Sequence, residues 1–178
     1  ACHAGDAVLA DIDRGKIDQV IIGNILSAGQ GMNIARQIGV HLGLPISAPA
    51  FTVNMMCASG MQAISLAAQA IRCGDANAIL CGGTESMSNA PHLMPRSRAG
   101  IKLGDGKLVD SILRDGLVDS FDHSHMAFTA ENLATKYDIS REEQDAFAAE
   151  SQRRYEDALQ RGAFADELVV HAKLDADE

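Results

Sequence analysis

Cys57 holds the position in this sequence best suited to covalent chemistry. A short apolar stretch with the β-branched residues Thr52 and Val53 precedes it, and the small residues 58–60 that follow allow a tight turn. Because a helical pattern comes next, we expect the cysteine at a helix N-terminus, where unpaired N–H groups and the helix dipole favour a thiolate. A thiolate attacks carbonyl carbon, so the position suits acyl transfer through a thioester. A buried structural cysteine is the open alternative, because free cysteines are among the most buried residues.

The elements that must position Cys57 alternate between strands and helices. Residues 61–72 repeat apolar side chains at a spacing of three and four, and small apolar residues on the other faces predict a buried helix. The other predicted elements are a helix ending near Gly15, a strand over 16–26, a helix over 33–42, a strand ending near Val53 and a strand over 76–81. This alternation indicates an α/β fold with a mainly parallel sheet covered on both faces.

The second half of the chain departs from this alternation. Ser140 and Glu143 have the spacing of a capping box, which predicts the start of a long helix. The elements predicted here are a hairpin around Gly104–Gly106 within an irregular excursion over 82–113, a helix over 126–137, the capped helix ending at Arg161, and a strand over 168–174. The excursion is either a surface loop or a contact between subunits.

Composition limits the classes of function. The 178 residues are 47% hydrophobic, which is enough for a sizeable core, and the net charge of −9 excludes a non-specific nucleic-acid surface. No apolar run approaches the about 20 residues of a membrane span, and the N-terminus has no signal-peptide pattern, so we expect a cytoplasmic protein. The four cysteines and six histidines lack the spacing of disulfides or metal ligands, so no metal is expected.

Four motifs follow the order of a known family. They are NMMCASG over 54–60, GGTESMSNAP over 82–91, His125-Met126 with TAEN over 129–132, and GQGMNIARQ over 29–37. Together they resemble the thiolases, which are acyl-CoA acetyltransferases, and the resemblance covers essentially the whole chain. Ile34 stands where the family commonly has proline, and the stretch 169–174 looks shorter than in relatives.

The resemblance implies a thiolase-like layered α/β/α fold with a mainly parallel sheet. This chain would supply the N-terminal half and part of the loop domain, with a core over 1–90 that is incomplete at its start and a loop domain over 91–178 that is incomplete at its end. The family's catalytic histidine and second cysteine belong to a second half that this sequence does not contain. Such a half would expose a large apolar face.

The same resemblance implies an activity. An acetyl group would pass between acetyl-CoA molecules in a ping-pong reaction through a Cys57 thioester, forming or cleaving acetoacetyl-CoA, with coenzyme A thioesters as substrates and no cofactor. A degradative 3-ketoacyl-CoA thiolase of fatty acid metabolism and a non-catalytic binding or assembly module remain alternatives. A cysteine hydrolase would need a histidine base, and His125 does not resemble one.

The resemblance also implies roles for four further residues. His125 and Met126 would line the acyl and pantetheine cavity, with Met126 limiting acyl length, and Leu117 matches another pocket position. Glu85 is expected at the cavity floor, where structural support is favoured over proton transfer. The backbone N–H of Cys57 would contribute to the oxyanion hole, and the excursion would build the contact of a homotetramer or dimer.

Overall fold

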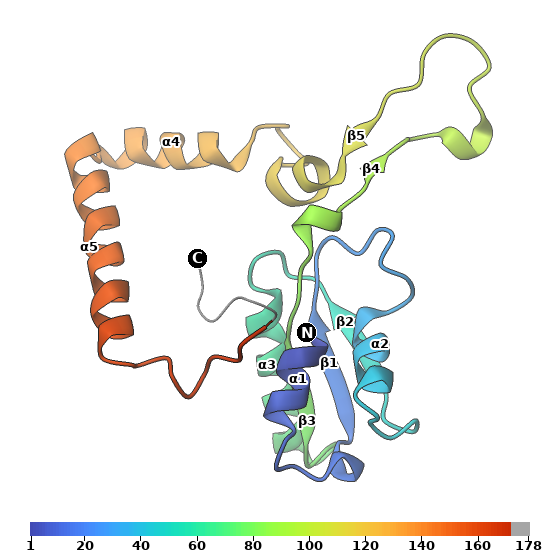
Figure 1. Cartoon of the computed structure of the whole chain (residues 1–178). Helices are drawn as coiled ribbons and strands as arrows, with labels where there is room; N and C mark the ends of the chain where they lie inside the picture. Colours follow the sequence, from blue (N-terminus) through green and yellow to red (C-terminus); the bar gives the residue numbers. More distant parts are fainter. Residues whose placement is uncertain (172–178) are drawn as a thin grey trace. The chain divides into compact units, whose positions relative to one another are not determined.

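The computed structural model describes residues 1–171, which form two compact units, one over 1–120 and one that begins at Phe121. The first unit is built on three parallel strands, β1 (Gln19–Gly23), β2 (Ala50–Val53) and β3 (Ile79–Gly83), in the order β2-β1-β3 (Figure 1). The predicted parallel sheet is therefore confirmed. The sequence placed the domain boundary at residue 90, whereas the contacts divide the chain after Ser120.

The central strand β1 explains how the core is arranged. Ile21 is paired with Phe51 on one side and with Cys81 on the other, so β1 is hydrogen-bonded along both edges. Successive side chains of a strand point to opposite faces. Val20 and Ile22 accordingly join one apolar cluster and Ile21 joins another, which confirms that both faces of the sheet are covered.

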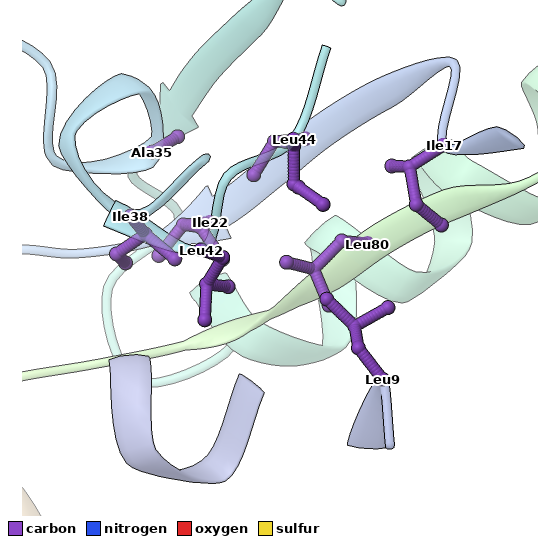
Figure 2. Close-up of a cluster of buried hydrophobic side chains, with 9 residues drawn as sticks. Leu9, Ile17, Ile22, Ala35, Ile38, Leu42, Leu44 and Leu80 are labelled. Carbon is purple, nitrogen blue, oxygen red and sulfur yellow. The ribbon is translucent and has the colours of Figure 1, made fainter. Parts of the chain in front are cut away.

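The helices α1 (Cys2–Val8) and α2 (Ile34–His41) belong to the larger cluster (Figure 2). Nine buried residues form this cluster: Leu9, Ile17, Val20, Ile22, Ala35, Ile38, Leu42, Leu44 and Leu80. The helix predicted to end near Gly15 ends at Val8 instead, and a short 3-10 turn, η1 (Arg14–Lys16), leads into the sheet.

Helix α3 (Ser59–Cys73) covers the other face of the sheet. Its small residues Ala63 and Ala67 are buried against Ile21, which lets the helix backbone lie close to the strands. The opposite side of α3 is open, since Met61 is 74% exposed and Ile64 is 57% exposed. The predicted burial of this helix is thus correct for one face only, because within residues 1–171 the helix packs on the three-stranded sheet through that face.

The rest of the first unit is a hairpin with short turns. Strands β4 (His92–Leu93) and β5 (Val109–Asp110) pair antiparallel, which confirms a hairpin that encloses Gly104–Gly106. The turns beside it are η2 (Met87–Asn89), η3 (Ser97–Ala99) and the π-helical turn η4 (Leu113–Leu117).

The second unit contains two helices, α4 (Met126–Tyr137) and α5 (Arg141–Gln160), both of which were predicted. Ser140 and Glu143 form the expected capping box, with the Ser140 Oγ accepting from the Glu143 N–H and the Glu143 carboxylate accepting from the Ser140 N–H.

The strand predicted over 168–174 is not formed at residues 168–170, which have no regular secondary structure, and residues 172–174 lie outside the described part. At His171, within the same predicted range, the chain forms an isolated β-bridge. Within residues 1–171, no helix is long and apolar enough to cross a membrane.

Candidate functional site

The turn between β2 and α3 presents Cys57 at the surface. Cys57 is exposed, and the turn before it is held by two side chains that flank it in sequence. The Asn54 Oδ1 accepts from the Met56 N–H at 3.0 Å, a local turn bond that asparagine commonly makes. The Ser59 Oγ accepts from the Met55 N–H at 2.8 Å and donates to the Met56 carbonyl at 2.5 Å. The alternative of a buried structural cysteine is therefore wrong for this chain.

The helix end behind Cys57 is open to a ligand. The N-cap of α3 is Ala58, which has no side-chain oxygen, so no side chain caps the first turn of the helix. Most backbone N–H groups near Cys57 already donate hydrogen bonds within the turn. These donors are the N–H groups of Met55, Met56, Ala58 and Ser59. The thiol thus lies beside a helix N-terminus with positive potential, where developing negative charge is stabilised.

Three glycines let the Cys57 turn approach the sheet. A Cβ at Gly23, the last residue of β1, would lie 2.5 Å from the Ser59 carbonyl carbon and 2.7 Å from the Gly60 nitrogen. A Cβ at Gly83, the last residue of β3, would lie 3.3 Å from the Gly60 Cα. The start of α3 is therefore seated against the carboxyl ends of two strands at van der Waals contact, which leaves no room for any side chain at Gly23.

Glu85 ties together the loops that follow β3 and β1. One carboxylate oxygen accepts from the Asn24 Nδ2 at 3.0 Å and from the Leu26 N–H at 3.1 Å, and the other accepts from the Ile25 N–H at 2.8 Å. Asn24 is only 3% exposed and also donates to the Thr84 carbonyl. Glu85 itself is exposed in the part of the chain that the structure describes. Its three donors favour the supporting role over proton transfer.

We expect Glu85→Gln to lower the free energy of unfolding by about 1–2 kcal/mol. The amide keeps one acceptor oxygen but sets an NH₂ group against an N–H donor of the loop, which leaves that donor unpaired. Urea unfolding of the full-length protein measures the change, with Glu131→Gln on the exposed surface of α4 as the matched control. An unfolding free energy equal to that of the wild type would show that these bonds contribute nothing to stability.

The pocket residues implied by the resemblance lie in both units. Leu117 is half-buried at the end of η4, and the preceding Gly116 approaches the Leu26 side chain, so Leu117 belongs to the same unit as Cys57 and Glu85. His125 and Met126 belong to the second unit, which is described separately.

His125 caps helix α4, and Met126 is the first residue of that helix. The His125 Nδ1 accepts from the Ala127 N–H at 3.1 Å, so in the neutral ring the proton is on Nε2, which can donate to a ligand. The Met126 side chain is 51% exposed and free to adapt to an acyl chain.

Two further observations concern the Cys81 thiol and groups of possible metal ligands. Burial raises the pKa of the Cys81 thiol, which keeps it protonated and makes it a weaker nucleophile than an exposed thiolate. Among residues 1–171, no group of three or more histidine, cysteine and acidic side chains could hold a metal ion.

Sequence reasoning missed Ser59, Asn24 and Gly23 as parts of this site. The spacing of Asn54 two residues before Met56 is a local signal of a turn, and it could have drawn attention to the clamp around Cys57. No local signal marks Gly23, because its contact with the start of α3 joins residues that are far apart in the sequence.

Comparison with known proteins gives consistent matches along the chain. The family described as thiolase, N-terminal domain, matches residues 2–177. The acetyl-CoA acetyltransferase of Pseudomonas aeruginosa is 54% identical over 158 residues, which cover 89% of this chain and 40% of that protein. The acetyl-CoA acetyltransferase of Allochromatium vinosum is 51% identical over 154 residues, which cover 86% of this chain and 39% of that protein.

A solved structure has the same fold. The Acat5 thiolase from Ascaris suum, in complex with coenzyme A, superposes with a TM-score of 0.90 at 41% identity, covering 98% of this chain and 46% of that one. The chain therefore spans 40% or less of the length of the two curated relatives.

Proposed function

Since this chain belongs to the thiolase family, we propose that it supplies the nucleophile of an acetyl-CoA acetyltransferase, with Cys57 as the residue that carries the acetyl group. The observation that carries the proposal is the exposed Cys57 thiol in a clamped turn beside the uncapped N-terminus of α3. The relatives named acetyl-CoA acetyltransferase support the reaction class, and the coenzyme A complex of the Ascaris suum thiolase supports the substrate class.

In the first half of the reaction, the Cys57 thiolate attacks the carbonyl carbon of acetyl-CoA. The carbonyl electron pair moves to oxygen, and the Cys57 N–H stabilises that oxyanion. The intermediate then collapses, the bond to the coenzyme A sulfur breaks, and coenzyme A leaves after taking up a proton. The acetyl group stays on Cys57 as a thioester.

In the second half, an α-proton is removed from another acetyl-CoA and the resulting enolate carbon attacks the Cys57 thioester. Acetoacetyl-CoA forms and the Cys57 thiolate returns, and the reverse sequence cleaves acetoacetyl-CoA with coenzyme A. These proton transfers need a base, for which the family uses a histidine and a second cysteine in the half of the protein that this chain does not span. Cys57 would thus perform the acyl transfer, and the absent half would perform the carbon chemistry.

His125, Met126 and Leu117 are proposed, from the family resemblance, to contact the substrate. The His125 Nε2–H is available to donate to a carbonyl of the substrate, because the Nδ1 is held by the helix cap. The exposed apolar Met126 and the half-buried Leu117 suit contact with a short acyl chain. Glu85 would act indirectly, by accepting hydrogen bonds that hold the loop after β1.

We expect Met126→Ala to shift activity toward longer acyl chains. The lost side chain frees room for about one or two methylene groups, each worth about 0.8 kcal/mol when buried, so the ratio of kcat/KM for a longer substrate to that for acetoacetyl-CoA should rise about 4- to 15-fold. Kinetics of the full-length protein on 3-ketoacyl-CoA substrates of increasing length measures this ratio, with Met87→Ala, another exposed methionine, as the control. An unchanged chain-length profile would refute the role of Met126.

The proposed function is tested by mixing full-length protein with acetyl-CoA and quenching in acid. We expect one acetyl group per chain by intact mass, mapped to Cys57, and its removal when free coenzyme A is added before the quench. A protein that takes no label, or that carries the label at another residue, would contradict the proposal and favour a non-catalytic thiolase-like chain.

The oligomeric state, cellular location and metabolic role of the protein are also part of the proposal. A homotetramer with contacts made by the loop between β4 and β5, a cytoplasmic location and a place in fatty acid metabolism all rest on the family resemblance. The exposed residues of that loop, which include Ile101 and Leu103, support a contact between subunits.

A further inference from the structure

The Ser59 side chain points backwards along the chain instead of capping its own helix. A serine at a helix start commonly accepts from N–H groups of the first turn. The Ser59 hydroxyl instead bonds the two residues that precede Cys57, accepting from the Met55 N–H and donating to the Met56 carbonyl. The Ser59 N–H also donates to the Met56 carbonyl at 2.9 Å. One buried residue, 5% exposed, therefore makes three bonds to two consecutive residues.

These bonds hold a backbone conformation that methionine rarely adopts. Met56 has a φ of 51°, in the left-handed region that is unfavourable for residues with a side chain. Such a conformation persists where the surrounding structure holds it in place, and it is frequent at functional sites. Here the Ser59 hydroxyl and the Asn54 side chain hold it from both ends.

The clamped carbonyl shares a peptide plane with the N–H of Cys57. A trans peptide unit is planar and directs its C=O and its N–H in opposite directions. No peptide bond in the described residues is cis, so the Met56 carbonyl that Ser59 binds sets the direction of the Cys57 N–H. With the carbonyl turned toward Ser59 at the start of α3, that N–H points away from it.

We infer that Ser59 is a positioning residue that orients the oxyanion-binding N–H of Cys57. The inference rests on the proposed function, because the N–H has this role only if Cys57 attacks a thioester. Ser59 touches neither the substrate nor the thiol, and it acts by fixing the peptide between Met56 and Cys57. Loss of its hydroxyl lets this peptide rotate and removes an oxyanion donor without removing the nucleophile.

The test compares two reactions of Cys57 in full-length protein. Acetylation by acetyl-CoA passes through an oxyanion, whereas alkylation by iodoacetamide is a displacement at saturated carbon that forms none. We expect Ser59→Ala to slow acetylation about 10- to 100-fold, since one oxyanion donor contributes up to about 10²–10³-fold, and to leave alkylation at Cys57 within about threefold. Ser59→Thr keeps the hydroxyl and should restore acetylation. Ser65→Ala, another serine of α3, is the matched control and should react as the wild type does.

The outcomes separate this inference from the proposed function. Equal loss in both reactions, no loss in either, or no recovery in Ser59→Thr would overturn the positioning role while Cys57 remains the nucleophile. A wild type that is alkylated but never acetylated would overturn the proposed function and this inference with it. Where Ser59→Ala does not fold, Ser59→Cys keeps the volume with much weaker hydrogen bonds, and peptide mapping then restricts both rates to Cys57.

Discussion

Cys57→Ala removes covalent acetylation of the full-length protein and lowers kcat by at least about 10⁴-fold, the scale seen when a catalytic nucleophile is deleted. The effect is expected to be this large because the whole ping-pong route passes through the Cys57 thioester, and neither the oxyanion donor nor the pocket can replace the attacking sulfur. Mass spectrometry after an acid quench measures the label, and steady-state kinetics with acetyl-CoA measures the rate.

Cys73→Ala is the matched control for this experiment. Cys73 is also an exposed thiol, but it is the last residue of α3, at the opposite end of the helix from the turn that holds Cys57. We expect Cys73→Ala to acetylate at the wild-type rate. Label that persists in Cys57→Ala, at Cys73 or elsewhere, would show that the nucleophile is assigned to the wrong residue.

Gly23→Ala should be the most damaging change outside the nucleophile. The new Cβ would lie 2.5 Å from the carbonyl carbon of Ser59 and 2.7 Å from its oxygen, and these are backbone atoms that cannot rotate away. Either β1 or the start of α3 must shift, at a cost of about 1–3 kcal/mol or more in the free energy of unfolding. Because the displaced backbone is that of Ser59, we also expect acetylation of Cys57 to slow at least about tenfold.

Gly82→Ala is the control for the stability effect of Gly23→Ala. Gly82 lies in β3, paired with Ile22, and a Cβ there meets no atom within 4 Å among the described residues. The free energy of unfolding of Gly82→Ala should therefore stay within about 0.5 kcal/mol of that of the wild type. Similar losses in both variants by urea unfolding would mean that glycine flexibility, and not contact with α3, determines the result at Gly23.

The outer face of α3, which does not contact the sheet, carries exposed apolar side chains. Met61, Ile64 and Ile71 are exposed on a helix whose other side is packed on the sheet. The pattern of small and apolar residues predicted burial all round, and the resemblance predicted an exposed apolar face in a chain of this extent. The second prediction agrees with the exposure of these three side chains, because the described residues do not cover the outer face of α3.

Local interactions determined the parts of the protein that the sequence predicted well. The capping box of Ser140 and Glu143 involves residues three positions apart, and the alternation of strand and helix around Cys57 follows from side-chain periodicity within each segment. The turn at Cys57 is of the same kind, because Asn54 and Ser59 hold it from within six residues. The position of Cys57 just before a helix could therefore be predicted without a structure.

Contacts between distant segments determined the rest, and only the tertiary structure shows them. Glu85 finds its donors about sixty residues away at Ile25 and Leu26, and Gly23 touches the start of α3 because β1 lies at the centre of the order β2-β1-β3. The strand predicted over 168–174 is absent at residues 168–170 and is only an isolated bridge at His171, because strand pairing depends on residues elsewhere in the sequence. The sequence by itself thus predicted which residue would attack, and the packing of β1, β3 and α3 determined how the turn at Cys57 is held.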